Sequence, residues 1–83
     1  MTRRLTLLGQ PGCHLCHEMR AVVDAVAHDI PLTLEEVDVD RDAALAARYG
    51  NEVPVLAVNG RTAFKYRVDL RALRARLARE PVA

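Results

Sequence analysis

The sequence predicts one α/β domain in which helices cover both faces of a mixed four-stranded sheet. A chain of 83 residues has the size of a single domain, so we assign residues 1–83 to one unit. Apolar and amphipathic stretches alternate in the order strand, helix, strand, helix, strand, strand, helix. A helical crossover makes the first two strands parallel, whereas a tight turn makes the last two antiparallel. A three-layer sandwich of this kind buries every apolar stripe.

The first two predicted elements are a short buried strand and an amphipathic helix. Residues 5–8 are largely apolar and are followed at once by Gly-Gln-Pro-Gly, as expected for a buried strand. A helical pattern runs from about Cys13 to Ala27, and Pro31 prevents its continuation. Its apolar residues recur at helical spacing and form one stripe: Leu15, Met19, Val22, Val23, Val26 and Ile30.

The middle of the chain predicts a strand over residues 32–39 and then a short helix. The apolar residues change parity within this strand, because Leu34 and Val37 would point to opposite faces. We therefore expect a bulge, or a late start of the strand, near Glu35-Glu36. The Asp-Arg-Asp segment that follows offers N-caps for a helix over residues 43–49, which Gly50 ends.

Two strands and a helix complete the predicted order. Residues 55–58 form a continuous apolar strand, and Asn59-Gly60 is a strong signal for a hairpin turn. The returning strand, residues 62–64, is short. Asp69 then caps a last amphipathic helix, whose inward-facing residues we predict to be Leu70, Leu73 and Leu77.

Cys13 and Cys16 are the residues to which we assign chemistry. A disulfide across so short a loop would restrain the unfolded chain very little, so a purely structural bridge is disfavoured. Cys13 stands where strand gives way to helix, and we expect it in the first helical turn. There the unpaired N–H groups and the helix dipole lower the pKa of a thiol. Cys16, one turn deeper, is suited to resolve a mixed disulfide.

Val53-Pro54 is the second candidate element of the site. The strand that follows is expected to pair antiparallel beside the first strand, which brings its beginning next to Cys13. A proline that opens a central strand fits if its peptide bond is cis, because Val53 can then turn its backbone groups outward toward an extended substrate. The alternative is an ordinary trans proline before a strand.

Three segments together form a pattern more specific than two cysteines alone. They are LLGQPGCHLCH at residues 7–17, VDVD at residues 37–40 and EVPVLAVNG at residues 52–60. With these segments the chain resembles glutaredoxin-like proteins of the thioredoxin superfamily, especially a short bacterial group. The resemblance covers almost the whole chain. It implies a thioredoxin-like three-layer sandwich and the activity of a dithiol–disulfide oxidoreductase.

The resemblance also implies roles for individual residues. Cys13 corresponds to the nucleophile, Cys16 to the resolving cysteine, Pro54 to the cis-proline and Val53 to the substrate-pairing residue. His14, beside the nucleophile, is counted among the substrate-binding residues; it either stabilises the thiolate or simply faces solvent. The expected partner is a disulfide-containing protein or a low-molecular-weight thiol, and no cofactor is expected.

The chain departs from well-studied glutaredoxins at two places. Those proteins carry Pro-Tyr between the cysteines, where this chain has His14-Leu15. They also have Gly-Gly and acidic residues after the hairpin, which hold the γ-glutamyl end of glutathione. Here residues 63–69 read AFKYRVD, and Asp69 alone could serve as the acidic part, although it is equally a helix cap. Glutathione remains a possible partner, but its binding motif is not matched.

Three other interpretations of the same residues stay open. Cys13, Cys16, His14 and His17 are four metal-ligand donors within five residues, so a metal or iron–sulfur cluster carrier is an alternative, although side chains on one helical turn diverge. The C-x-x-C-H spacing also matches haem attachment, which needs export and a second axial ligand. A non-catalytic binding module on the same fold is the third.

Composition points to a cytoplasmic protein without nucleic-acid or membrane partners. The apolar run near the N-terminus is shorter than the roughly 7–15 residues of a secretory signal. No stretch approaches the ~20 apolar residues of a membrane span. A net charge of +1 gives no general attraction to nucleic acid or acidic lipid. We expect a monomer.

Overall fold

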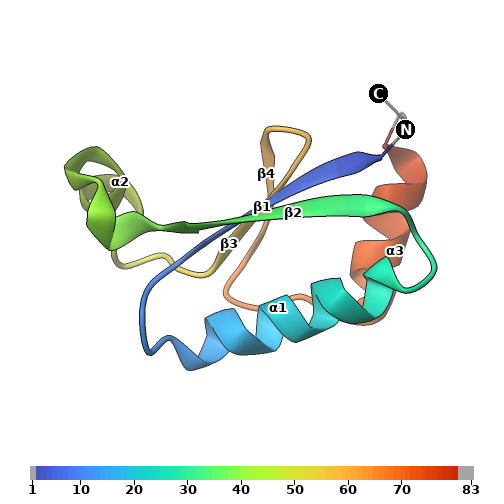
Figure 1. The fold of residues 1–83 in the computed structure, drawn as a ribbon, viewed down its shortest axis with the longest axis horizontal. Coiled ribbons are helices and arrows are strands. Elements are labelled where there is room, and N and C mark those ends of the chain that lie inside the picture. The colour runs from blue at the N-terminus through green and yellow to red at the C-terminus, as the bar shows by residue number, and fades with distance from the viewer. Residues whose placement is uncertain (1, 81–83) are drawn as a thin grey trace.

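The computed structural model describes residues 2–80, in which the elements follow the predicted order (Figure 1). The strands are β1 (Arg3–Gly9), β2 (Leu32–Asp38), β3 (Val55–Val58) and β4 (Arg61–Lys65). The helices are α1 (His14–Ala27), α2 (Ala43–Tyr49) and α3 (Leu70–Arg79), with a single 3₁₀ turn, η1 (Val39–Arg41), before α2. Each helix within residues 2–80 is too short or too polar to span a bilayer.

The four strands form one mixed sheet in the order β2-β1-β3-β4. β1 and β2 are parallel, whereas β3 is antiparallel to both β1 and β4. Figure 1 shows α1 and α3 together on one side of the sheet, while α2 lies apart from them beyond the carboxyl end of β2. The predicted fold class is confirmed. α2 covers little of the sheet, since none of its residues is buried.

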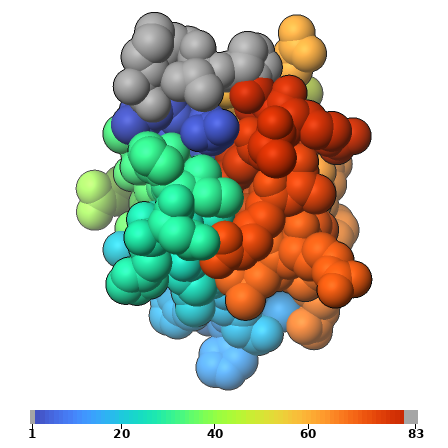
Figure 2. Space-filling model, turned by 90° about the vertical axis from the view of Figure 1, so that its right-hand side faces the viewer, coloured from blue at the N-terminus to red at the C-terminus, as the bar shows by residue number. Residues whose placement is uncertain are grey.

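The core lies between the sheet and the pair α1 and α3, which Figure 2 shows side by side. Its buried side chains come from β1, α1, β3 and α3: Leu5, Leu7, Met19, Val23, Val26, Leu56, Val58, Leu73 and Leu77. The prediction that Leu70 also points inward is wrong, since it is 44% exposed. It begins α3, and this first turn lies at the rim of the core rather than over it.

The expected irregularity in β2 is absent, and that prediction is wrong. β1 and β2 stay in register from Arg3 opposite Leu32 to Gly9 opposite Asp38. A regular strand suffices because both faces have some apolar cover: Leu34 packs against the core, whereas Val37 is half-buried on the opposite face. The bulge of this sheet lies instead between β3 and β4, next to Leu56 and Ala57.

The predicted caps and turn are present. The Asp42 carboxylate accepts hydrogen bonds from the Ala44 and Leu45 amides at the start of α2, at 2.9 and 3.2 Å. Asp69 accepts one from the Ala72 amide at 2.7 Å and so caps α3. Asn59-Gly60 turns β3 into β4 with φ values of 50° and 85°, the two positive φ angles of a type I′ hairpin.

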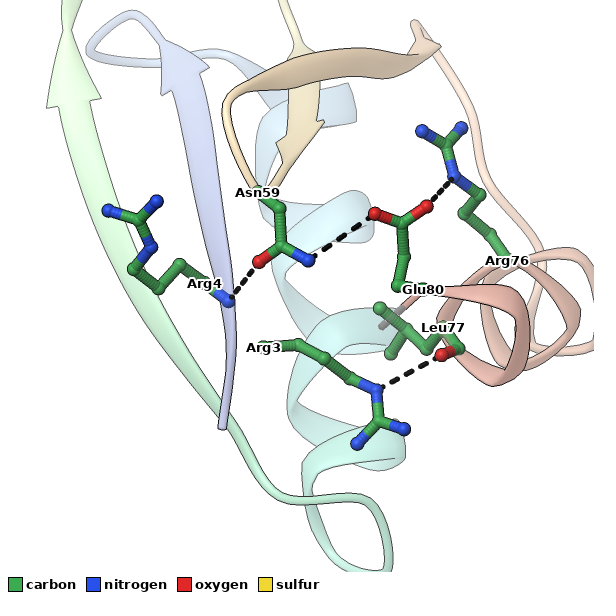
Figure 3. A network of polar contacts seen from close by, with 6 residues as sticks. All are labelled: Arg3, Arg4, Asn59, Arg76, Leu77 and Glu80. Atoms are coloured by element: carbon green, nitrogen blue, oxygen red, sulfur yellow. Dashed lines mark hydrogen bonds and ion pairs between the residues drawn. The ribbon is translucent and has the colours of Figure 1, made fainter. Parts of the chain in front are cut away.

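A polar network joins the hairpin, β1 and α3 at the end of the sheet where β1 begins (Figure 3). Asn59 Oδ1 accepts a hydrogen bond from the Arg4 amide at 3.0 Å, and Asn59 Nδ2 donates to Glu80 Oε1 at 3.3 Å. Arg3 Nε donates to the Leu77 carbonyl at 3.0 Å. The first strand and the last helix are therefore fastened to each other.

Glu80 makes the stability of this network depend on pH. The Arg76 guanidinium, whose Nε lies 3.0 Å from Glu80 Oε2, holds the pKa of that carboxyl below its ordinary value. Such a group stabilises the fold fully above its unfolded pKa, and the contribution is lost as the pH falls through the folded pKa. We expect the free energy of unfolding to decrease from roughly pH 5.5 to pH 3, and to decrease less in Glu80→Gln.

Urea unfolding at stepped pH measures this dependence. A matched control is Glu35→Gln on β2, because Glu35 takes part in no ion pair among residues 2–80. The Glu35→Gln protein should follow the parent curve. If Glu80→Gln and the parent protein lost stability in parallel, the ion pair with Arg76 would not be the source of the acid sensitivity.

Candidate active site

Cys13 lies in the connection between β1 and α1, directly before the first helical residue. Its backbone is extended, with φ −79° and ψ 110°, and its amide donates to the Gln10 carbonyl at 3.3 Å. Gly12 precedes it with φ +75°, a left-handed conformation that favours glycine. Cys13 is therefore the N-cap of α1, one position earlier than the first turn predicted from the sequence.

Cys13 and Cys16 are joined by a disulfide, with Cα atoms 5.2 Å apart. The Cys16 amide donates a hydrogen bond to Cys13 Sγ at 3.1 Å, so this sulfur occupies the acceptor position that serine or aspartate oxygens fill in other N-caps. Cys13 is partly exposed, whereas Cys16 is only 6% exposed. A reactant from solvent can therefore reach the outer sulfur far more readily than the inner one.

Gly9, the last residue of β1, passes close to the inner sulfur. A Cβ atom at this position would lie 3.0 Å from Cys16 Sγ, closer than side chains normally approach. A glycine at the end of β1 thus lets the strand run beside Cys16 and keeps that sulfur sheltered.

The β1–β3 pairing brings Val53 and Pro54 to the same end of the sheet as the disulfide. The ladder ends at Leu8 opposite Val55, so the residues just before β3 lie next to those that lead to Cys13. Pro54 is buried, and the Val53–Pro54 peptide bond is cis. The Pro54 carbonyl accepts a hydrogen bond from the Tyr66 amide at 2.8 Å, which fastens this loop to the segment after β4.

Gln10 is a residue of the site that the sequence did not reveal. Its Nε2 donates to Asp40 Oδ1 at 3.1 Å and to the Gly50 carbonyl at 3.0 Å, while its own carbonyl accepts from Cys13. The loop before Cys13 is therefore anchored to η1 and to the end of α2. In the sequence, Gly-Gln-Pro-Gly indicates a turn, and no local signal indicates these distant partners.

Gln10→Ala should loosen this loop. The substitution removes two hydrogen bonds, each contributing about 0.5–1.5 kcal/mol, so we expect a destabilisation of roughly 1–3 kcal/mol and a changed rate of Cys13 alkylation in the reduced protein. Gln10→Glu should destabilise more, because it places a carboxylate beside Asp40 and a carbonyl oxygen. Urea unfolding and timed alkylation test both. Equal stability of all three proteins would contradict an anchoring role.

The two histidines near the cysteines are solvent-facing. His14 is the first residue of α1, His17 lies one turn further on, and neither side chain makes a hydrogen bond or ion pair within the described part of the chain. Residues 2–80 contain no group of three or more His, Cys, Asp or Glu side chains arranged to hold a metal ion. The structure places the Val53-Pro54 loop at the same end of the sheet as the Cys13–Cys16 disulfide, and His14 is exposed next to Cys13.

The βαβαββα order and the mixed four-stranded sheet are those of the thioredoxin fold, and the cysteine pair lies at the start of the first helix. The structure of a mutant thioredoxin from Halobacterium salinarum is similar, with a TM-score of 0.69 and 26% identity over 98% of this chain and 78% of that one. Within this class the chain belongs to the family described as the Glutaredoxin-like domain (DUF836), whose model matches residues 4–78. The resemblance stated from the sequence is confirmed.

Two further proteins are similar to this chain. A glutaredoxin-like protein of Dictyostelium discoideum is 33% identical over 66 residues, which cover 72% of this chain and 61% of the relative. The chain therefore spans less than two thirds of that protein's length. A crystal structure of a protein from X. campestris is 37% identical, with a TM-score of 0.77 over 93% of this chain and 99% of that one.

Proposed function

We propose that the protein is a dithiol–disulfide oxidoreductase that uses the Cys13–Cys16 pair for thiol–disulfide exchange with protein or small-thiol substrates. The observation that carries this proposal is the asymmetry of the pair. Cys13 is partly exposed at the N-terminus of α1 and its sulfur accepts a hydrogen bond from the Cys16 amide, whereas Cys16 is buried and its sulfur lies beside Gly9. One sulfur is thus available to a substrate and the other is held for an internal step.

In the reducing direction, the Cys13 thiolate attacks one sulfur of the substrate disulfide. A bond forms between the two sulfurs, the substrate disulfide breaks, and the second substrate sulfur leaves as a thiolate. Cys16 then loses its proton to solvent and attacks Cys13 Sγ, which forms the Cys13–Cys16 disulfide and releases the first substrate sulfur as a thiolate. Two electrons pass from protein to substrate, and the reverse sequence oxidises a dithiol.

The position of Cys13 favours the thiolate in both directions. Before reaction, the Cys16 N–H and the positive end of the α1 dipole stabilise a negative sulfur at the N-cap. When the sequence runs in reverse, Cys16 leaves as a thiolate as the Cys13–Cys16 disulfide opens, and the same groups stabilise Cys13 as the thiolate that leaves when the mixed disulfide is resolved. No acidic residue lies in the first turn of α1 to oppose this effect.

Val53, Pro54 and His14 are proposed to meet the substrate. Val53 is half-buried two residues before β3, at the end of the sheet where Cys13 lies, so an extended chain bound to Cys13 would pass beside it. We further propose that the protein works as a monomer in the cytoplasm, without a cofactor and without nucleic-acid or membrane partners. Glutathione remains a candidate thiol whose γ-glutamyl motif is not matched at residues 63–69.

A redox titration tests the proposed function. The protein is equilibrated in a series of glutathione buffers, its free thiols are alkylated, and the fraction of Cys13–Cys16 disulfide is read from the mass. We expect a reversible two-electron transition within roughly −270 to −120 mV. Thiols that remain blocked until a chelator is added would instead favour a metal or cluster carrier, and thiols that never exchange would favour a non-catalytic binding module.

A further inference from the structure

A groove opens between α1 and the segment that links β4 to α3. Its volume is about 300 Å³, and its lining is mostly apolar. We call it the α1 groove and define it by its lining residues, which are Leu15, Glu18, Met19, Ala21, Val22, Tyr66, Arg67 and Val68. Several of these side chains belong to the stripe that the sequence assigned to the core, yet Leu15 and Val22 are only half-buried.

Two residues that line the α1 groove connect it to the region of the reactive pair. Leu15 lies between the two cysteines in the sequence. The Tyr66 amide donates a hydrogen bond to the carbonyl of Pro54, at the end of the sheet where the disulfide lies. At 1.5 Å per residue, the groove extends along α1 from roughly 3 Å to roughly 14 Å beyond Cys13. Two or three residues of an extended peptide span the distance from Cys13 to the middle of the groove. A substrate chain bound at Cys13 can therefore lay a neighbouring side chain into the groove.

The rim of the groove carries two charged residues and an aromatic residue whose backbone is fixed by a hydrogen bond. Arg67 and Glu18 form a loose ion pair at 3.8 Å, with side chains 76% and 60% exposed, so each is readily available to another partner. Tyr66 is 45% exposed and has a φ of +68°, an uncommon conformation for a tyrosine. The hydrogen bond from its amide to Pro54 holds it in place. Residues other than glycine with a positive φ cluster at active sites and ligand-binding sites.

We propose that the α1 groove binds an apolar side chain two or three residues from the reactive cysteine of a polypeptide, so that the preferred substrate is a protein disulfide. This inference rests on the proposed disulfide exchange. Glutathione disulfide suits the groove poorly, because it would place carboxylates over an apolar floor with only Arg67 to receive them. An apolar side chain leaves the floor dry and needs no polar partner.

Matched peptides test the preference. Each has one cysteine carried as a mixed disulfide with 5-thio-2-nitrobenzoate, and leucine or serine stands two and three residues away on both sides. Attack of reduced Cys13 on the peptide sulfur releases the coloured thiolate, and Cys16 then frees the peptide. Because burial of a leucine side chain is strongly favourable, we expect the leucine peptide to react about tenfold faster than the serine peptide.

Variants of the groove locate the effect. Val22→Thr keeps the shape of the floor but adds a hydroxyl, and Tyr66→Asn removes the ring while it tolerates a positive φ; both should bring the rate ratio toward one. Ala27→Ser is the control, since Ala27 is exposed on α1 and outside the groove, and it should keep the parent ratio. Tyr66→Asn changes an exposed residue, so the test stands even if Val22→Thr fails to fold.

The outcomes separate this inference from the proposed function. A ratio near one in the parent protein, with both peptides reacting, would overturn the groove and leave disulfide exchange intact. The same holds if glutathione carrying the same coloured thiolate reacted faster than the leucine peptide. Release of colour from no substrate at all would overturn the proposed function, and the inference with it.

Discussion

Cys13→Ser is expected to lower the rate of disulfide exchange to the uncatalysed background. Cys13 is the partly exposed residue of the pair, and its sulfur accepts a hydrogen bond from the Cys16 amide, so its loss removes both the proposed nucleophile and the group that the helix terminus stabilises. A hydroxyl in its place is not deprotonated near neutral pH. Turnover of a small disulfide with a coupled reductant measures the change, and full activity in Cys13→Ser would show that the roles are wrongly assigned.

Cys16→Ser provides the matched variant. It keeps the first attack by Cys13 but lacks the thiol that resolves the product, so a mixed disulfide between Cys13 and the substrate should accumulate. Mass analysis without reductant detects that adduct. Because Cys16 is buried, its replacement by serine also places a hydroxyl in the apolar interior, and the fold of the variant is checked by circular dichroism. Absence of an adduct in a folded Cys16→Ser protein would argue against Cys13 as the nucleophile.

Leu73→Ala is expected to produce the largest loss of stability. Leu73 is fully buried where α3 meets the core, and truncation of a buried leucine costs about 2–5 kcal/mol. A chain of 83 residues has a total stability of about 4–12 kcal/mol, so the variant should lose a substantial part of it. Chemical denaturation followed by circular dichroism gives the difference in the free energy of unfolding.

Leu70→Ala, on the same helix, is the control for this experiment. Leu70 is 44% exposed at the rim of the core, and an exposed substitution of this kind usually changes stability by less than about 0.5 kcal/mol. Equal losses in Leu70→Ala and Leu73→Ala would mean that α3 packs differently from the arrangement described above.

The order of elements could be predicted because each carries its own local signal. Asp42 and Asp69 indicate helix starts, Asn59-Gly60 indicates the hairpin, and the unbroken apolar run of β3 identifies a buried strand without reference to its partners. Cys13 could be placed near a helix start for the same reason. Its exact place as N-cap depends on the Gly12 conformation, which shifts the start of α1 by one residue.

The remaining features depend on contacts between distant segments. Gln10 acquires its role from Asp40 and Gly50, which no pattern around residue 10 reveals. The parity change in β2 predicts a bulge on the assumption that only one face of the sheet is covered. The strand is regular because both faces are partly covered, which the sequence alone does not show. Likewise, helical spacing correctly predicts that Val22 packs against the core, but it does not show that Val22 also lines an open groove.

The hydrogen bond from Arg3 to the Leu77 carbonyl has a practical consequence for immobilising or fusing the protein. It joins the first strand to the last helix at one end of β1, while Cys13 follows the other end, roughly 20 Å away along a seven-residue strand. A tether, an affinity tag or a fused domain attached through either of these neighbouring segments would leave the molecule from the same pole. The protein can therefore be immobilised on a surface by one pole while the opposite pole stays free to meet a large reactant.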